Sequence, residues 1–312
     1  MLSRRREFVL LFDVRNGNPN GDPMSANVPR TDPTTGHGLV SDVSIKRRIR
    51  DYVALTREDQ EGYAIYVAEQ TLLNDAHAAA WEAAGLAEIA YRNSLPDDPE
   101  SAHAITRYMC ARYFDIRAFG AVMTTSINAG QVRGPVQLSI ASSVEPIEPL
   151  DLVVTRVAAT TARRRAKTRR TLGRRSIVPY GLYRLHGFVS PMFASHPLKG
   201  TGFSEDDLAV LFEAIGGMFE LDRSASRGEM TVRDLVVFEH DSVLGNASAD
   251  ALFRRVTVRR VAEVGSDEIV SDPTRAFGAA RSFDDYEVCV DSDGLPRGVT
   301  LRRPLHGSGR GS

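Results

Sequence analysis

The chain has 312 residues, of which 42% are hydrophobic and 25% are charged, the balance of an ordinary soluble globular protein with a sizeable core. Its two cysteines, Cys110 and Cys289, lie far apart and form no CxxC pair, which excludes a disulfide framework and a thiolate zinc site and suits a reducing cytoplasm. The first apolar run breaks at Asp13 and no run approaches the roughly 20 residues needed to cross a bilayer, so a signal peptide and a membrane-spanning helix are not expected.

The net charge of −1 conceals two biases. All but three of the 39 basic residues are arginine, whose planar fork suits bidentate phosphate contacts, although coding bias also enriches arginine. Residues 152–204 hold eleven basic residues and no acidic one, whereas residues 57–100 hold ten acidic residues against two basic. This segregation predicts a bipolar particle with one surface suited to a polyanion.

The first predicted element is a largely buried strand, Glu7–Val14, with apolar side chains alternating on both faces. One face carries Phe8, Leu10, Phe12 and Val14, and the other carries Val9 and Leu11. The segment that follows, Asn16–Gly38, is dense in Asn, Gly, Pro, Asp and Thr. It is too long for a turn and is typical of a functional loop.

A helix is predicted over Ser41–Thr56, with Ser41 or Asp42 as its N-cap. Its apolar stripe consists of Ile45, Ile49, Tyr52 and Val53. At 100° per residue, Lys46, Arg47 and Arg50 cluster on another face. Such a basic face is often merely solvated, but here it follows the loop at once, so loop and helix could grip the same nucleic-acid backbone.

The remaining elements alternate between helical and extended patterns. Helices are predicted over 60–91, 102–114 and 204–215, and strands over 134–144, 179–190, 230–238 and 286–290. Val136, Leu138 and Ile140 give the strand over 134–144 its alternation. The helix that begins after Ser204 has capping-box spacing with Asp207, and Gly216-Gly217 is predicted to stop it.

Without its insertions the order is strand, helix, strand, strand, helix, strand, which predicts an α+β fold of the ferredoxin-like βαββαβ type used by RNA-recognition domains. The expected boundaries are a single elaborated domain with its core in 7–56, 134–144 and 179–240, a helical insertion at 57–118, a basic insertion at 145–178 and a C-terminal portion at 241–312. The aromatic motif with which these domains stack bases is absent. Any RNA must therefore be bound mainly by loops and insertions.

The loop motif Asn16-Gly-Asn-Pro-Asn-Gly-Asp22 invites comparison with a calcium loop. An EF-hand begins with Asp and needs Glu at its twelfth position, whereas this loop begins with Asn and has Asn27 there, so no metal site is expected. One alternative is a turn shaped by residues that tolerate left-handed backbone. The other is that Asn18 and Asn20 contact phosphate and ribose at the end of an RNA-binding sheet.

The strongest general signal is the basic run between 163 and 175. Its candidate RNA-binding residues are Arg163, Arg164, Lys167, Arg169 and Arg170. Such a density of positive charge repels itself unless an anion neutralises it, and phosphate binding through it would weaken steeply with salt. The alternatives are a solvated loop and a membrane-surface patch, and the lack of aromatic or leucine anchors argues against the membrane.

A second candidate segment leads into the predicted strand over 134–144. Gln131 and Arg133 stand between Gly130 and Gly134, an arrangement that suits contact with an RNA backbone. No catalytic motif accompanies these sites: the seven histidines are scattered, and no GxSxG, GxxxxGK[ST] or GxGxxG occurs. We expect no enzyme and no cofactor. The rival is a metal-independent endoribonuclease that uses His37 beside Arg or Tyr residues.

The segments FDVRNGNPNGDP, SDVSIKRRIRDY and above all DIRAFGAVMTTSINAGQVRGPVQLSIASSVEPI resemble the crRNA-binding backbone subunit of subtype I-C Cascade, a CRISPR-associated RAMP protein of the Cas-seven family. The resemblance implies a hand-shaped, modified RNA-recognition fold with fingers and a projecting thumb hairpin. It implies that 145–178 is the thumb, that 57–100 belongs to the fingers, and that Lys46, Arg47 and Arg50 bind guide phosphates on the same surface as Gln131 and Arg133.

The resemblance also implies partners and a mode of action. The implied partners are the crRNA, target DNA, head-to-tail copies of the chain, an end-capping RAMP subunit, large and small subunits, and a recruited helicase-nuclease. Type III relatives cleave target RNA with a loop aspartate, but type I members leave destruction to the recruited nuclease, so no catalytic role is expected for Asp22 or Asp32. The protein would hold the guide by its backbone and leave the base edges free to pair with DNA.

Overall fold

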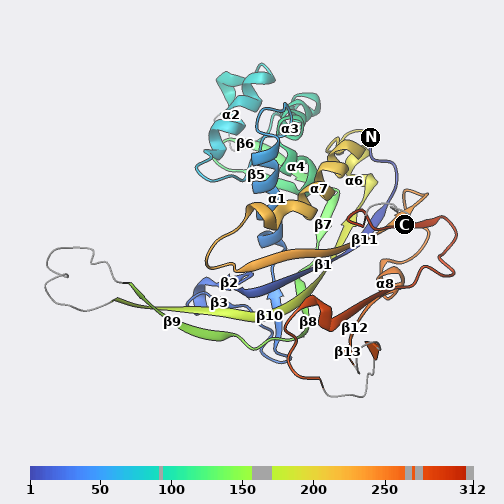
Figure 1. Cartoon of the computed structure of the whole chain (residues 1–312). Helices are drawn as coiled ribbons and strands as arrows, with labels where there is room; N and C mark the ends of the chain where they lie inside the picture. The colour runs from blue at the N-terminus through green and yellow to red at the C-terminus, as the bar shows by residue number, and fades with distance from the viewer. Residues whose placement is uncertain (91–93, 157–170, 264–268, 271–276, 307–312) are drawn as a thin grey trace, which may run out of the picture.

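The centre of the fold is an antiparallel sheet whose middle strands are long. A computed structural model describes residues 1–90, 94–156, 171–263, 269–270 and 277–306 (Figure 1). The sheet has the order β16-β11-β1-β10-β8-β4, with β7 and β9 also paired to β10. Its main strands are β1 (Arg6–Gly17), β7 (Val136–Leu138), β8 (Ala141–Pro146), β10 (Thr171–Val189) and β11 (Glu229–His240).

The chain order within this sheet is that of a ferredoxin-like fold. Helix α1 (Asp42–Thr56) follows β1, and helix α7 (Glu205–Leu221) lies between β10 and β11. The first core strand pairs with the third and the fourth, and the second lies outside the third. The predicted βαββαβ core is therefore confirmed, and β4 (His37–Val40) and β16 (Val299–Arg302) extend its two edges.

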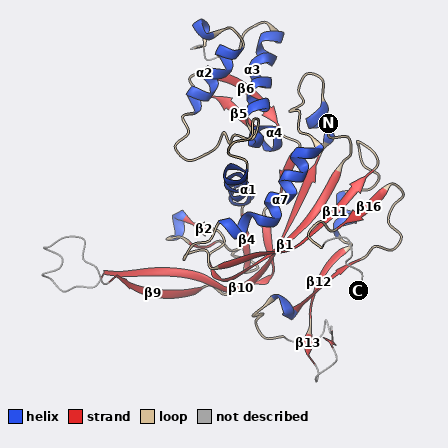
Figure 2. Ribbon diagram, turned by 45° about the horizontal axis from the view of Figure 1, so that its top comes forward, coloured by secondary structure: helices blue, strands red, loops and turns tan. Residues whose placement is uncertain are grey.

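One face of the sheet packs against α1 and α7 (Figure 2). The four β1 side chains predicted for one face, Phe8, Leu10, Phe12 and Val14, are all fully buried in this core. Ser41 accepts a hydrogen bond from the Ser44 amide and caps α1, as predicted. The alternating apolar side chains of β1 thus form the face on which α1 packs, and the loop that joins β1 to α1 lies at one end of β1.

The opposite face of the sheet is a second core rather than an open platform. Val9 and Leu11 lie there, covered by α8 (Ala249–Phe253), β12 (Val256–Arg260) and β15 (Tyr286–Val290). In RNA-recognition domains bases stack on this face. Here the C-terminal portion occupies it, which agrees with the absence of stacking aromatics from the sequence.

The insertion after α1 has a hydrophobic core of its own around Trp81, whose indole N–H donates to the Asn128 carbonyl at 2.8 Å. Burial lowers the pKa of His77, which bridges the Tyr66 hydroxyl and the Ile127 carbonyl. The elements are α2 (Leu73–Ala83), α3 (Pro99–Arg112), α4 (Phe114–Phe119), β5 (Gly120–Thr124) and β6 (Asn128–Arg133). The insertion therefore runs past 118 and ends with a hairpin that the expected boundaries left unassigned.

Strand β9 (Leu150–Arg156) pairs with the first part of β10 to form a hairpin that projects from the body (Figures 1 and 2). This hairpin falls within 145–178, where the resemblance places a thumb, and it is called the thumb below. The expected strand start at 179 is wrong, because β10 runs unbroken from 171 to 189 and belongs both to the thumb and to the central sheet. The other short elements are β2 (Gly21–Asp22), β3 (Val28–Pro29), α6 (Pro191–Ser195), β13 (Ala262–Glu263) and β14 (Ile269–Val270).

Three local predictions need correction. The pattern over 60–91 is helical only in α2 and in a 3-10 turn at Ala87–Ile89. The strand over 134–144 is interrupted between β7 and β8, where Ile140 is exposed instead of buried. Gly216-Gly217 does not stop α7, which continues to Leu221. A Cβ on Gly217 would meet the Tyr52 ring at 2.5 Å, so glycine here serves the close packing of α1 on α7.

Candidate nucleic-acid interface

The Asn-rich loop lies at the base of the thumb. Gly17, at the end of β1, is opposite Val178 of β10, and β3 within the loop contacts β10 (Figure 1). The Asn20 side chain accepts a hydrogen bond from the Ser41 amide at 2.9 Å, which ties the loop to the start of α1. Loop, helix α1 and thumb base therefore meet on one part of the molecule.

The two asparagines predicted to contact RNA shape this loop. Asn18 is buried, and its amide nitrogen donates to the Asn27 carbonyl at 2.7 Å. Its side-chain oxygen is also buried and has no hydrogen-bond partner among the described residues. Asn20 is half-buried and holds the helix start. Both residues are therefore placed to fix the path of the loop, and the surface around them is formed by other side chains.

Arg48 is the residue that anchors the loop, and the sequence analysis missed it. Its guanidinium is buried and donates to the Pro19 carbonyl at 2.8 Å and to Asp222 at 2.9 Å. Burial lowers its pKa to about 10, and it still carries its positive charge at neutral pH. A signal was present: Arg48 falls at helical spacing within the stripe of Ile45, Ile49 and Tyr52, a position that normally faces the core.

Replacing Arg48 by lysine should loosen the loop, because an ammonium group cannot make the forked contacts to Pro19 and Asp222 at once. We expect a loss of about 1–3 kcal/mol in the free energy of unfolding. Hydrogen exchange at the Asn27 amide, which donates to the Asp22 carbonyl, should quicken. Arg47→Lys, a change of the neighbouring exposed arginine, is the control. Equal exchange rates in both variants would contradict the anchoring role.

The three basic residues predicted on α1 divide into two kinds. Lys46 pairs with Asp42 at 2.9 Å and Arg47 pairs with Asp51 at 2.8 Å, each one helical turn away; the Arg47 pair is exposed and the Lys46 pair is half-buried at the surface. Surface pairs of this kind contribute only about 0–1 kcal/mol, so a phosphate could replace either carboxylate. These two residues remain candidates for phosphate contact.

Arg50, by contrast, points inward. Its guanidinium donates to Asp115 at 2.7 Å, and that carboxylate is 1% exposed and also accepts the Tyr66 and Val67 amides. The pair fastens α1 to the insertion, and breaking it would leave a buried charge without a partner. The structure therefore gives Arg50 a structural position, and we leave it out of the candidate interface.

Three further arginines stand on the elements that form the loop and the thumb base. Arg15, at the end of β1, is exposed and has no ion pair with any described residue. Arg30 reaches Asp22 only at 3.7 Å, and Arg175 is half-buried beside β9. The Nε atoms of Arg30 and Arg175 are buried with no hydrogen-bond partner in the described part of the chain. Buried polar atoms are normally satisfied, so these two Nε atoms lack a hydrogen bond that such atoms usually make.

The thumb itself is described only near its base. Arg174 pairs there with Asp151 across the hairpin. The candidates Arg163, Arg164, Lys167, Arg169 and Arg170 lie outside the described residues. Their phosphate contacts remain predictions.

Gln131 and Arg133 lie on β6, at the border of the α1 surface. The Lys46 ammonium lies 5.6 Å from the centre of the Phe119 ring, and Gly120, the next residue, pairs with Arg133. Both side chains are exposed, and the Arg133 guanidinium stacks on Phe193 at 4.2 Å. Gly134 is not a point of ligand approach: a Cβ there would meet the backbone of Phe119 at 2.2 Å, so it serves packing within the chain.

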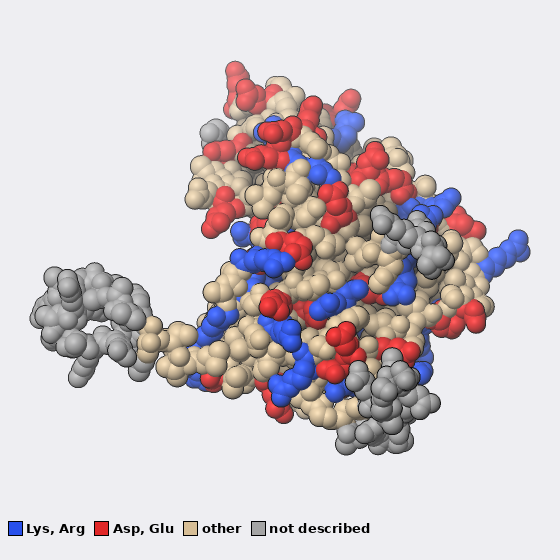
Figure 3. Space-filling model, viewed as in Figure 1, with Lys and Arg blue, Asp and Glu red and all other residues tan. Residues whose placement is uncertain are grey.

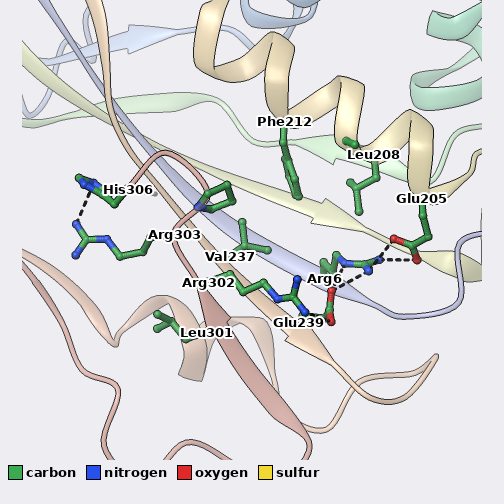
Figure 4. A pocket seen from close by; sticks show the side chains of 12 residues that line it. Arg6, Glu205, Leu208, Phe212, Val237, Glu239, Leu301, Arg302, Arg303 and His306 are labelled. Carbon is green, nitrogen blue, oxygen red and sulfur yellow. Dashed lines mark hydrogen bonds and ion pairs between the residues drawn. The ribbon is translucent and has the colours of Figure 1, made fainter. Parts of the chain in front are cut away.

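Acidic side chains gather over the α2 and α3 region at the top of Figure 3, whereas acidic and basic side chains are interspersed over the rest of the face in view. The acidic half of the predicted segregation of charge is therefore visible, and most of the basic run lies outside the described residues. No helix in the described part of the chain is long and apolar enough to cross a membrane.

The residues considered for catalysis do not form a constellation. Asp22 accepts the Met24 amide and Asp32 accepts the Thr34 amide, so each closes a turn of the loop. The Thr34 hydrogen bond, with that of Thr35, lowers the pKa of Asp32. His37 begins β4 at the sheet edge, and its ring makes no hydrogen bond with the described residues. Among those residues, no group of three His, Cys, Asp or Glu side chains could hold a metal ion.

Comparison with known proteins agrees with this architecture. The family model described as CRISPR-associated protein Cas7 matches residues 4–291. A CRISPR-associated protein Cas7 of Haloferax volcanii is 41% identical over 63 residues, which is 20% of this chain and 17% of that protein.

One solved structure extends the comparison to the fold, and a second is similar over a smaller part of the chain. A chain of a CRISPR RNA-guided surveillance complex in a pre-nicking state aligns over 85% of this chain and 84% of its own length, with a TM-score of 0.51 and 14% identity. A chain of another CRISPR RNA-guided surveillance complex aligns over 74% of this chain and 68% of its own length, with a TM-score of 0.41 and 12% identity. Since the family model spans nearly all of the described body, the chain belongs to the Cas7 family of CRISPR-associated proteins.

Proposed function

We propose that this chain is the crRNA-binding backbone subunit of a type I surveillance complex, of subtype I-C. The observation that carries the proposal is the meeting of the loop, the first helix and the thumb base, where Arg15, Arg30 and Arg175 lack full partners. Lys46 and Arg47, on the helix that follows the loop, make ion pairs that a phosphate can replace. The subtype rests on the likeness of the loop, helix and GQVRGP segments to subtype I-C subunits.

The proposed mechanism is recognition of the RNA backbone. Arginine and lysine side chains bind phosphates whatever the base, and the loop fixed by Arg48 sets the path of the strand. The sheet face that would stack bases is covered by the C-terminal portion, so base edges stay free to pair with target DNA. Sequence is then read by pairing and not by this chain.

The proposed assembly is a row of copies joined head to tail along one guide. An interface of that kind need not close into a ring, and it gives an open filament whose length the RNA and end subunits set. We infer an end-capping RAMP subunit, large and small subunits and a helicase-nuclease as further partners, and the cytoplasm as the compartment. In this scheme the chain is not an enzyme, and destruction of DNA belongs to the recruited nuclease.

Co-expression with a guide-encoding transcript tests the proposal. We expect the purified chain to retain the guide RNA, to protect it from nuclease in regular intervals and to leave a pre-crRNA uncut, because its proposed role is to hold the RNA. Sequencing of the retained RNA and incubation with labelled pre-crRNA are the measurements. Release of guide-sized products that His37→Ala abolishes would instead establish the endoribonuclease alternative. A chain that retains no RNA would refute the backbone role.

A further inference from the structure

A cavity of about 550 Å³ opens between the insertion and the core, apart from the thumb base. Three segments that are distant in sequence form its walls: one face of α3, the end of β6, and the turn after α6. The residues that line it include His103, Arg107, Gln131, Arg133, Phe193 and Lys199. Its volume falls within the range of small-ligand sites, about 300–1,000 Å³.

Local features hold these walls in place. Gly130 allows α3 to approach β6, since a Cβ there would meet the Thr106 hydroxyl at 2.8 Å. The turn that carries Lys199 is closed by His196, whose Nδ1 accepts the amides of Leu198 and Lys199, each at 3.2 Å. Gly200 fits tightly against the His196 backbone, where any side chain would clash. The cavity is therefore formed by ordered backbone on each side.

The charge of this cavity is one-sided. No Asp or Glu lines it, and Arg107, Arg133 and Lys199 have no carboxylate partner among the described residues. Arginines elsewhere in that part of the chain are commonly paired, as Arg117 is with Asp207 at 2.7 Å. Unpaired cations around a cavity raise the local concentration of anions and favour an anionic ligand.

The cavity also offers flat and apolar surface. The Arg133 guanidinium stacks on the Phe193 ring at 4.2 Å, which orients its plane and leaves the N–H edge for hydrogen bonds. Leu95 and Leu198 add apolar area beside the Gln131 amide. A phosphate next to a planar ring is the chemistry that such a mixture of cations, stacked plane and amide accommodates.

We propose that this cavity binds one nucleotide unit of a single strand, with the phosphate on Arg107 and Lys199 and the base or ribose against the Arg133–Phe193 stack. The inference rests on the proposed function. It gives the complex a second contact with nucleic acid, located beside the insertion. The strand is either the guide itself or the target strand paired beside it, since both present the same phosphodiester. An acidic protein segment would match the charge but would leave the stacked plane unused.

A photo-crosslinker within the cavity separates these sources. Leu198 is 64% exposed, so Leu198→benzoylphenylalanine should leave the fold intact. The variant is loaded with labelled guide RNA and irradiated, then loaded with unlabelled guide and labelled target DNA and irradiated again. A crosslink to either strand supports the cavity site and identifies its source. A crosslink to a second copy of the chain, or none in a particle that holds its guide normally, overturns it.

Charge reversal provides an independent measurement on the same particle. Arg107→Glu with Lys199→Glu should weaken binding of the strand identified above at least fivefold, because each change replaces a phosphate partner with a repelling carboxylate. The matched control is Arg254→Glu with Arg223→Glu, two exposed arginines far from the cavity in sequence. An unchanged affinity in the cavity variant overturns the site while the proposed function stands. Failure of the unmodified chain to hold any guide is the separate result that removes the proposed function itself.

Discussion

A chain with Lys46→Ala and Arg47→Ala should bind guide RNA roughly tenfold to a hundredfold more weakly than the unmodified chain. Each residue offers one charge-assisted contact to phosphate, and such contacts contribute about 1.5–3 kcal/mol before competing surface ion pairs are subtracted. Loss of two phosphate contacts should also flatten the dependence of affinity on salt, by about 1.4 in the logarithmic slope for a single strand. Filter binding at several salt concentrations measures both quantities.

Two comparisons of the loss of affinity test this prediction: one between guides of different sequence, and one between the α1 variant and a variant at another site. Because phosphate contacts carry no sequence information, guides of unrelated sequence should lose affinity by the same factor. Arg223→Ala with Arg254→Ala is a matched control, since each of these exposed arginines also pairs with a carboxylate within one helical turn. A loss confined to one guide, or an equal loss in the control, would show that α1 does not form the grip.

Asp207→Ala should destabilise the fold by about 3–5 kcal/mol, the cost typical of removing one partner from a buried ion pair. Asp207 is buried, and its carboxylate accepts two hydrogen bonds from Arg117, at 2.7 Å and 3.0 Å. It also completes the capping box of α7 with Ser204. Without it the Arg117 charge stays buried between α4 and α7. Urea unfolding measured by circular dichroism gives the free energy.

Two controls on the same helix turn isolate the cause. Ser204→Ala removes only the cap and should cost about 1 kcal/mol. Asp206→Ala removes an exposed carboxylate from the same turn and should change the free energy by less than about 0.5 kcal/mol. If Asp207→Ala were no worse than Ser204→Ala, the ion pair to Arg117 would add nothing beyond the cap.

Local sequence patterns predicted much of this fold, because interactions between neighbouring residues determine its strands and helix ends. The two-residue period of β1 and the polar caps Ser41 and Ser204 each depend on neighbours within one turn or strand, and all three are confirmed. The order of strands and helices then gave the ferredoxin-like core. The link between the loop and α1 was also predictable, because Asn20 and Ser41 are close in sequence.

The features that the sequence did not predict depend on contacts between residues that are far apart in the chain. Gly217 was predicted as a helix stop, but Tyr52 of another helix fills the space that a side chain would need. Arg50 has the sequence pattern of a surface cation, but its guanidinium donates a hydrogen bond to Asp115, which is 65 residues away in the sequence. The cover over the far sheet face comes from the C-terminal portion, whose pattern is weak because its strands are short. Such partners become visible only in three dimensions.

The unbroken course of β10 has a mechanical consequence. Its 19 residues extend over about 60 Å, and the half that leaves the body is continuous with the half that pairs with β1 along its whole length. A load on the free end is thus resisted by the hydrogen-bond ladder of the central sheet and not by a flexible joint. In a row of identical copies, such rigid hairpins would project at a constant spacing, and the subunits themselves would set that spacing.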